Sequence, residues 1–216
     1  MDSRVRLQLV SAEVKRSARA RATRRKVVSA AADLFIANGY GATTLDQIAE
    51  RAGVAVQTVY FHFGNKRTVL KEAVDVAAVG DDEPVPLMDR PWWRQLQQER
   101  DPARIVAAWV GNSREILGRV GPIMSVVRDA AAADPDMAEQ WATNRDQRAT
   151  AMRYLTDLLA ERGGLRPGLS IRTATDAAYA LLSIEVYLLL TADRGWTPAR
   201  WQRWTTDQLT AALLVA

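Results

Sequence analysis

The sequence contains no cysteine and a single histidine, His62. The lack of cysteine excludes disulfides, thiolate nucleophiles and metal sites with cysteine ligands. One histidine without such partners does not make an ordinary zinc site. We therefore expect no metal and no cofactor, and a solvated or phosphate-contacting role for His62 rather than a catalytic one.

Long apolar runs are also missing. The longest, Ala177 to Ala192, contains Glu185 and is shorter than the roughly 20 residues that a membrane-spanning helix needs. The basic N-terminus lacks the continuous apolar stretch of a secretory signal. We expect a soluble, cytoplasmic protein with no membrane partner.

Sequence motifs of catalysis are absent as well. There is no GxSxG elbow, phosphate-binding loop, dinucleotide fingerprint or cluster of metal ligands. An all-α enzyme that used Glu185 or His62 would need a converging acid, base or nucleophile, and none is apparent. The chain is therefore predicted not to be an enzyme.

The most informative stretch, residues 43–70, predicts a helix-turn-helix. Thr44 is placed to cap a first short helix, with Gln47 closing a capping box. The turn falls on Ala52-Gly53-Val54, where glycine supplies the positive φ of a tight helix end. A second helix is expected to begin near Val56.

The second helix has an inner and an outer side. Val59 and Phe63 repeat at helical spacing and are expected to pack inward. Asn65 is placed to cap a third helix, and Lys66 in its first turn opposes the usual preference for acidic residues there. A cation at that position suggests an external anion such as phosphate. The outer positions, which can meet DNA, are Val56, Gln57, Thr58, Phe61 and His62.

These residues resemble the N-terminal domain of the TetR/AcrR family of transcriptional regulators. The resemblance covers about residues 20 to 75 and is far more specific than a chance helix-turn-helix pattern. It is carried by Leu34-Phe35 and Gly39-Tyr40, then Thr43-Thr44, Ile48-Ala49, Ala52-Gly53-Val54, Val59-Tyr60-Phe61-His62-Phe63, Lys66 and Leu70.

The resemblance implies roles for individual residues. The phosphate backbone would be gripped by Thr43, Thr44, Tyr60, His62 and Lys66. Base edges would be faced by Val56, Gln57 and Thr58. Many family members carry Ser where this chain has Ala55, so a hydroxyl that would cap the recognition helix is missing. As alternatives, Tyr60 and Phe61 fit core positions of a three-helix domain, and Gln57 fits a plain exposed residue.

Charge is unevenly divided along the chain. Residues 1–78 contain 13 Lys and Arg against 7 Asp and Glu, a net +6, whereas the remaining 138 residues hold 16 and 18, a net −2. The basic residues gather at Lys15, Arg16, Arg19, Arg21, Arg24, Arg25 and Lys26. They predict a basic flexible arm over 1–19 that follows phosphates or enters a minor groove, and that is a solvated tail in the free protein. The helix-turn-helix domain is then placed at 20–78 and the effector-binding and dimerisation domain at 79–216.

Proline and glycine mark the helix boundaries beyond Val79. Asp101-Pro102, Asp134-Pro135 and Thr197-Pro198 each place a capping side chain before a proline at the first helical position, and Ser170 suits another start. The pattern predicts helices near 92–98, 102–118, 120–132, 135–162, 171–193 and 198–215. No segment alternates with period two for long enough to suggest a sheet. The fold is predicted to be all-α.

The last two predicted helices suggest a homodimer interface. Residues 177–190 are apolar nearly all round, which requires that another surface cover this helix. The final helix adds a stripe at Trp201, Trp204/Thr205, Gln208/Leu209 and Ala212/Leu213. Helices 171–193 and 198–215 of two subunits would form a four-helix bundle, as the family resemblance also implies. The alternative is a monomer in which both helices are buried core.

The segment between the DNA reader and this interface is expected to bind an effector, because members of the resembled family generally bind a small molecule among their central helices. Candidate pocket residues are Trp93, Trp109, Asn112, Met124, Arg128, Trp141, Arg145, Tyr179, Glu185 and Tyr187. Each of them also fits ordinary core or surface. Glu185 is the exception, since a carboxylate within an apolar run must be paired, protonated or solvated by a cavity. We expect it at the pocket wall or at the dimer seam.

The sequence thus predicts a sequence-specific transcriptional regulator of double-stranded DNA, a repressor released from a palindromic operator by a small apolar or aromatic effector. One alternative is an architectural DNA binder without effector control, in which the C-terminal domain serves only dimerisation. Ligand-dependent release of DNA separates the two. The remaining alternative is an all-α enzyme.

Overall fold

The computed structural model describes residues 3–80 and 90–215, with side chains from residue 18 onward. Within these ranges the chain forms ten α-helices and one short π-helical turn, and its only β pairing is an isolated bridge between Leu165 and Leu214. The predicted all-α fold is confirmed. The helices group into two compact units, Met1–Ala73 and Val74–Ala216.

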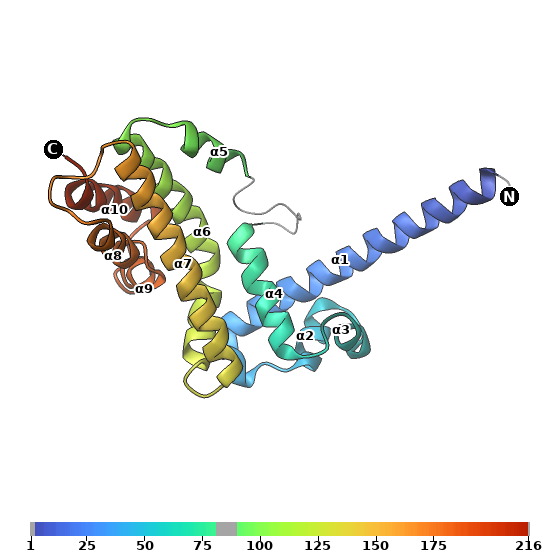
Figure 1. Ribbon diagram of the computed structural model, residues 1–216. Helices are drawn as coiled ribbons and strands as arrows, with labels where there is room; N and C mark the ends of the chain where they lie inside the picture. Colours follow the sequence, from blue (N-terminus) through green and yellow to red (C-terminus); the bar gives the residue numbers. More distant parts are fainter. Residues whose placement is uncertain (1–2, 81–89, 216) are drawn as a thin grey trace. The chain divides into compact units, whose positions relative to one another are not determined.

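The first unit contains α1 (Ser3–Ala42), α2 (Leu45–Ala52), α3 (Val56–Phe63) and the first part of α4 (Lys66–Val79) (Figure 1). Regular helix in α1 stops at Gly39, where the backbone turns to φ 79° and ψ 168°. Only glycine adopts such angles readily. The backbone of the expected basic arm continues α1, but the side chains of Lys15 and Arg16 lie outside the described part of the chain, and the arm stays a prediction.

One apolar core holds this unit together. It is built from Val27, Ala31, Phe35, Ile48, Val59, Phe63, Val69 and Leu70. Val59 is fully buried and Phe63 is 5% exposed, which confirms that this side of α3 packs inward. Asn65 precedes α4 and its Oδ1 accepts a hydrogen bond from Thr68 N at 2.9 Å, which confirms the predicted cap.

The second unit continues α4 and adds α5 (Pro91–Gln98), α6 (Pro102–Ala130), α7 (Pro135–Glu161), α8 (Ile171–Leu181), α9 (Ile184–Leu188), a π-helical turn (Leu189–Asp193) and α10 (Pro198–Leu213). Figure 1 shows α6 and α7 side by side, with α8, α9 and α10 gathered next to them. The predicted caps are confirmed, because each side chain accepts a backbone N–H at its helix start: Asp101, Asp134, Ser170 and Thr197.

Helix α6 corrects the prediction of two separate helices in its region. It continues through Pro122, although proline removes a backbone donor. Two glycines of α6 lie where α9 packs against it. A Cβ on Gly118 would lie 3.3 Å from the Tyr187 hydroxyl, and one on Gly121 would lie 3.4 Å from Leu188. The glycines therefore allow α9 to pack closely on α6.

The predicted helix over 171–193 is interrupted in the structure. α8 ends at Leu181, and α9 follows Ser183, whose Oγ accepts a hydrogen bond from Val186 N at 3.1 Å. By length and composition alone, Ile171–Asp193 would suffice to cross a membrane, and it is the one such run in the described residues. The break at Ser183 divides this run into two shorter helices.

Helix α10 belongs to the core of its own unit. Trp201, Thr205, Leu209 and Leu213 are fully buried where α10 packs on α6 and α8. This corrects the expectation that these positions cover a second subunit. Burial within a chain and burial between chains produce the same helical spacing, so the sequence pattern does not separate them.

Candidate functional site

The helix-turn-helix has the local geometry that its sequence predicts. Thr44 Oγ1 accepts a hydrogen bond from Gln47 N at 3.2 Å, and Gln47 Oε1 accepts one from Thr44 N at 2.9 Å, so the capping box is confirmed. Gly53 ends α2 with φ at 66°. Ala55 precedes α3, and no side chain caps this helix. The missing hydroxyl therefore leaves the start of α3 without a side-chain acceptor.

Thr43 and Lys66 both bind the connection between α1 and α2. Thr43 Oγ1 donates to the carbonyl oxygens of Gly39 at 2.8 Å and Leu34 at 3.2 Å. Lys66 Nζ donates to the carbonyl oxygens of Tyr40 at 2.7 Å and Thr43 at 2.9 Å. The Thr43 side chain is fully buried, which corrects the expectation that its hydroxyl contacts phosphate. Lys66 has a structural role in holding α4 to this connection.

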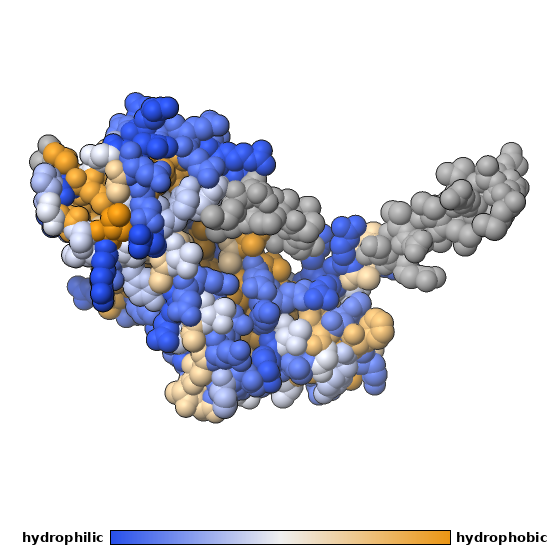
Figure 2. Space-filling model, viewed as in Figure 1, coloured by the Kyte–Doolittle hydropathy of each residue, from blue (hydrophilic) through white to orange (hydrophobic). Residues whose placement is uncertain are grey.

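The outer side of α3 is open to solvent. Tyr60 is 53% exposed and Phe61 is 85% exposed, so neither is a core aromatic. Figure 2 shows apolar surface over α3, next to polar residues. Gln57 is exposed, and the half-buried positions are Val56, Thr58 and His62. This mixture of apolar and hydrogen-bonding groups on one short helix suits the chemistry of base edges in a major groove.

Basic side chains of α1 lie on the same unit. Those at positions 19, 21, 25 and 26 are exposed. Arg24 forms an ion pair with Glu72 of α4, and its guanidinium lies 4.9 Å from the centre of the Phe63 ring. Arg24 therefore holds α1 against α3 and α4, whereas its exposed neighbours face the solvent.

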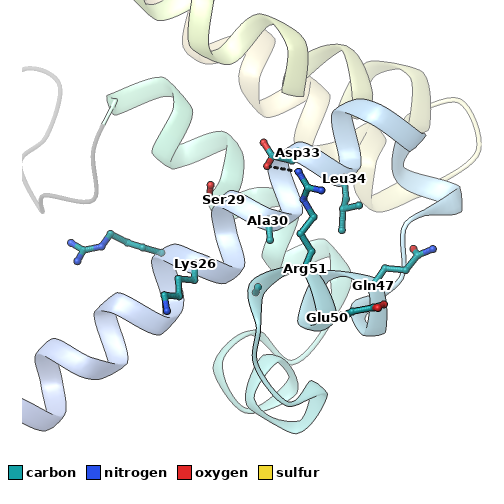
Figure 3. Close-up of a pocket in the computed structure, with 10 residues that line it drawn as sticks. Lys26, Ser29, Ala30, Asp33, Leu34, Gln47, Glu50 and Arg51 are labelled. Atoms are coloured by element: carbon teal, nitrogen blue, oxygen red, sulfur yellow. Dashed lines mark hydrogen bonds and ion pairs between the residues drawn. The ribbon is translucent and has the colours of Figure 1, made fainter.

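A wide groove of about 1000 Å³ lies between α1 and α2 (Figure 3). Arg51 and Asp33 point toward one another across it and form an ion pair at 3.2 Å. Its other charged lining residues are Arg25, Lys26 and Glu50. An open groove with charges of both signs suits water and ions better than an apolar effector.

A different cavity, of about 230 Å³, lies within the second unit among α5, α6, α7 and the break between α8 and α9. Its aliphatic and thioether walls are formed by Ile116, Leu117, Val120, Met124, Met152, Leu182 and Ile184. Polar groups enter from α6 and α7, at Asn112, Ser113, Asn144, Gln147 and Arg148. Arg148 is the one charged residue among the described residues that line the cavity.

Aromatic rings form one wall of this cavity. The ring centres of Trp93 and Tyr154 lie 4.5 Å apart at an interplanar angle of 31°, and Trp109 lies 5.9 Å from Trp93. Trp92 meets Trp109 edge-on at 6.4 Å. Such stacked and edge-to-face contacts stabilise the rings in one arrangement. The cavity therefore presents a rigid aromatic wall whose tryptophan rings are inclined to one another by 54° to 82°.

Two contacts position Arg148 at the edge of the cavity. Its guanidinium lies 4.6 Å from the centre of the Tyr179 ring, and its Nη1 lies 3.7 Å from Glu185 Oε2. The Arg148 side chain is 18% exposed and that of Glu185 is 44% exposed. Glu185 is thus paired, which is one of the states expected for it, and it is on the solvent side of the pair.

The structure brings together only part of the predicted pocket. Trp93, Trp109, Asn112 and Met124 line the cavity. Arg128 and Glu185 line a separate open groove beside α9. Tyr187 is buried and packs edge-on against Trp201, with ring centres 5.0 Å apart. The lining of neither hollow includes Trp141, Arg145 or Tyr179.

Sequence reasoning assigned the wrong residues of α7 to the cavity, Trp141 and Arg145. Asn144, Arg148 and Met152 are spaced by four residues, and the stripe continues to the fully buried Leu155 and Leu159. Polar residues on a helix stripe that becomes core need hydrogen-bonding partners or a cavity beside them. That change of polarity along one stripe was the signal available in the sequence.

Comparison with known proteins bears on both sites. Residues 27–73 match the bacterial regulatory proteins of the tetR family. The chain is 29% identical over 172 residues to the uncharacterized HTH-type transcriptional regulator YdeS of Bacillus subtilis, and the match covers 79% of this chain and 80% of YdeS.

Solved structures share the fold over most of the chain. NalD, the secondary repressor of the MexAB-OprM multidrug efflux pump in Pseudomonas aeruginosa, is 25% identical with a TM-score of 0.65, and the match covers 90% of this chain and 97% of NalD. SmeT in complex with triclosan is 23% identical with a TM-score of 0.70, covering 90% of this chain and 92% of SmeT. The likeness therefore extends well beyond the helix-turn-helix.

Proposed function

Because the chain belongs to the TetR family of bacterial transcriptional regulators, we propose that it is a homodimeric repressor that leaves a palindromic operator when a small apolar or aromatic effector enters the cavity of its second unit. As a member of this family it is a DNA-binding regulator and not an enzyme. One observation carries the finer proposal: the same chain has an exposed helix α3 in one unit and a largely apolar cavity in the other.

Exposure and position on α3 support a division of labour in DNA binding. Val56, Gln57 and Thr58 occupy the start of α3, the end of a recognition helix that reads base edges. Phosphate contacts are assigned to Thr44, Tyr60 and His62, and to the charge of Lys66. The exposed arginines of α1 add sequence-independent attraction to DNA. Such a protein acts where the chromosome is, in the bacterial cytoplasm.

The cavity supports control by a small molecule. Its walls are mostly apolar, with a few polar groups that would orient a ligand. SmeT, which has a similar fold, is known in complex with triclosan, and this favours a small-molecule effector here. The effector would release DNA only by binding more tightly to the form of the protein that does not fit the operator.

Apolar surface on the last helices supports a homodimer. Leu189 is 51% exposed and Val215 is 58% exposed. Trp196 and Trp204 form an edge-on pair, with ring centres 5.8 Å apart, at the start of α10. Figure 2 shows hydrophobic surface beside the C-terminus. We assign the interface to these exposed parts of 171–193 and 198–215, and a two-fold axis there implies a palindromic operator.

Selection of binding sites from random DNA at roughly physiological salt tests this function, since non-specific binding is weak there. We expect an enriched two-fold motif, and release of that DNA when effector is added from a panel of apolar and aromatic compounds. An enriched motif without release by any metabolite extract would favour the architectural binder. Failure to enrich any motif, with and without extract, would overturn the proposal.

A further inference from the structure

We infer that the effector of this cavity is a compact aromatic molecule that carries a carboxylate, and that Arg148 binds that carboxylate. The inference rests on the proposed function, because it names the chemical class of the effector. It is carried by the position of Arg148, the one charged lining residue among those that the structure describes, in a cavity whose other described lining groups are aromatic, aliphatic or uncharged polar.

The guanidinium of Arg148 has hydrogen-bonding capacity to spare. In the described part of the chain none of its N–H groups donates a hydrogen bond, although the side chain is only 18% exposed. The distance of 3.7 Å to Glu185 Oε2 is beyond hydrogen-bonding range. Tyr179 contacts the guanidinium through the face of its ring. This contact does not use the N–H groups that point outward in the plane of the guanidinium. A mostly buried cation with unused donors favours an acceptor beside it.

The charges around the cavity favour a carboxylate over a neutral acceptor. A planar guanidinium matches the two oxygens of a carboxylate and binds them with paired hydrogen bonds. Within ranges 3–80 and 90–215 no acidic residue lines the cavity, and Glu185 is 44% exposed, so water weakens its field. A carboxylate in the cavity therefore meets one positive charge in weakly screened surroundings.

The aromatic lining residues define the rest of the molecule. Trp93 and Trp109 present ring surface to the cavity, and flat aromatic groups stack on such surface. A volume of 230 Å³ is below the roughly 300–1000 Å³ usual for drug-sized ligands. We therefore expect a molecule about the size of two fused rings, with its carboxylate directed at α7.

Two molecules of the same shape and different charge test the inference: 2-naphthoate and 2-naphthamide. Their affinities for the full chain are measured by titration calorimetry. We expect 2-naphthoate to bind at least about tenfold more tightly than 2-naphthamide, as charge-assisted hydrogen bonds allow. Arg148→Gln should abolish this preference and change the affinity for the amide by no more than about twofold. Arg145→Gln, an exposed arginine of α7 outside the cavity, is the matched control and should keep the preference.

Equal affinities of the two molecules for the unmodified chain would overturn the inference, and so would an equal loss of both in Arg148→Gln. Absence of binding for both at millimolar concentration would also overturn it. Circular dichroism and melting temperature establish that both variants fold. If 2-naphthoate bound through Arg148 and left the operator occupied, the proposed release would fail, while the assignment of Arg148 as the carboxylate-binding residue of the cavity would stand. Release by neutral compounds with unchanged potency in Arg148→Gln would reject only this inference.

Discussion

The ammonium group of Lys66 lies 4.3 Å from the centre of the Tyr40 ring and donates a hydrogen bond of 2.7 Å to the Tyr40 carbonyl oxygen. The contact joins the first turn of α4 to the end of α1. Its partners are a main-chain oxygen and a ring face of the same residue, so the contact depends on the position of the backbone as well as on charge.

Replacing Lys66 with alanine should weaken folding as well as DNA binding. The loss of charged hydrogen bonds to two carbonyl oxygens is expected to lower the free energy of unfolding by about 1.5–3 kcal/mol. Urea unfolding followed by circular dichroism measures this change. Lys71→Ala, at an exposed lysine of the same helix, should stay within roughly 0.5 kcal/mol. Unchanged stability in Lys66→Ala would mean that Lys66 acts on DNA alone.

Gln57→Ala should change which bases are preferred and leave folding intact, because Gln57 is exposed on α3. A side-chain pair with a base is worth about 1–3 kcal/mol of discrimination. Binding to the selected operator and to its single-base variants should therefore become nearly equal at one position in each half-site. Asn38→Ala, at an exposed amide of α1, should leave the preference unchanged. A uniform loss on all sequences would show that Gln57 does not read bases.

Removing two basic residues of α1, with Arg19→Ala and Arg21→Ala combined, should weaken binding to every DNA sequence alike. Each lost phosphate contact makes the plot of log affinity against log salt shallower by roughly 1. Titrations at several salt concentrations measure the slope. Arg172→Ala with Arg203→Ala removes the same charge from exposed positions of the second unit and should leave the slope unchanged. If both double variants lowered the slope equally, the net charge of the protein would explain the effect, and contacts of Arg19 and Arg21 with phosphate would not.

Gly164→Ala should destabilise the second unit. A Cβ at this position would lie 2.5 Å from the Cβ of Pro102, so the backbone must shift, at a cost of about 1–3 kcal/mol. Gly111→Ala is the matched control, because its Cβ would meet only Gln202 Nε2 at 3.4 Å and it would gain up to roughly 1 kcal/mol of helix propensity. The melting temperature should therefore fall in Gly164→Ala and rise in Gly111→Ala. An unchanged melting temperature in Gly164→Ala would contradict the close approach of Gly164 to Pro102.

Stability should fall at alkaline pH because of Tyr187. Burial raises the pKa of its hydroxyl above the ordinary value, while the charge of Arg114 lowers it and that of Glu115 raises it further. The folded state then holds this proton more tightly than the unfolded state. The Tyr187 proton therefore adds to the free energy of unfolding. This contribution is complete below about pH 10 and is lost as pH rises past that value. Tyr187→Phe should make the alkaline loss in urea unfolding shallower, whereas Tyr60→Phe, at an exposed site, should not.

Local interactions made the helix ends predictable from sequence. The capping box of Thr44 and Gln47 and the positive φ of Gly53 need only residues within one turn of each other. The continuous α6 and the break at Ser183 were not predictable in this way. Proline ordinarily favours a helix end, so the continuation of α6 through Pro122 has no local signal, and α9 packs on α6 beside it.

The residues that line the cavity were likewise only partly predictable from the sequence. Large apolar residues such as Trp93, Trp109 and Met124 are conspicuous in a sequence, and they do line it. Arg148 resembles the other arginines of α7 until the helix is oriented, because one residue of rotation decides whether a side chain meets a cavity or solvent. The pairing of Arg148 with Glu185 joins two helices and has no local sequence signal.

The shared anchoring of Thr43 and Lys66 on the α1–α2 connection has a consequence for the kinetics of the first unit. Helix α3 has only 8 residues and is too short to persist in isolation. Its backbone amides should therefore exchange their hydrogens together with those of α2 and the first turn of α4, with one common rate of opening. The surface of α3 is then present as a whole or absent as a whole, and a single equilibrium sets the fraction of time for which it exists.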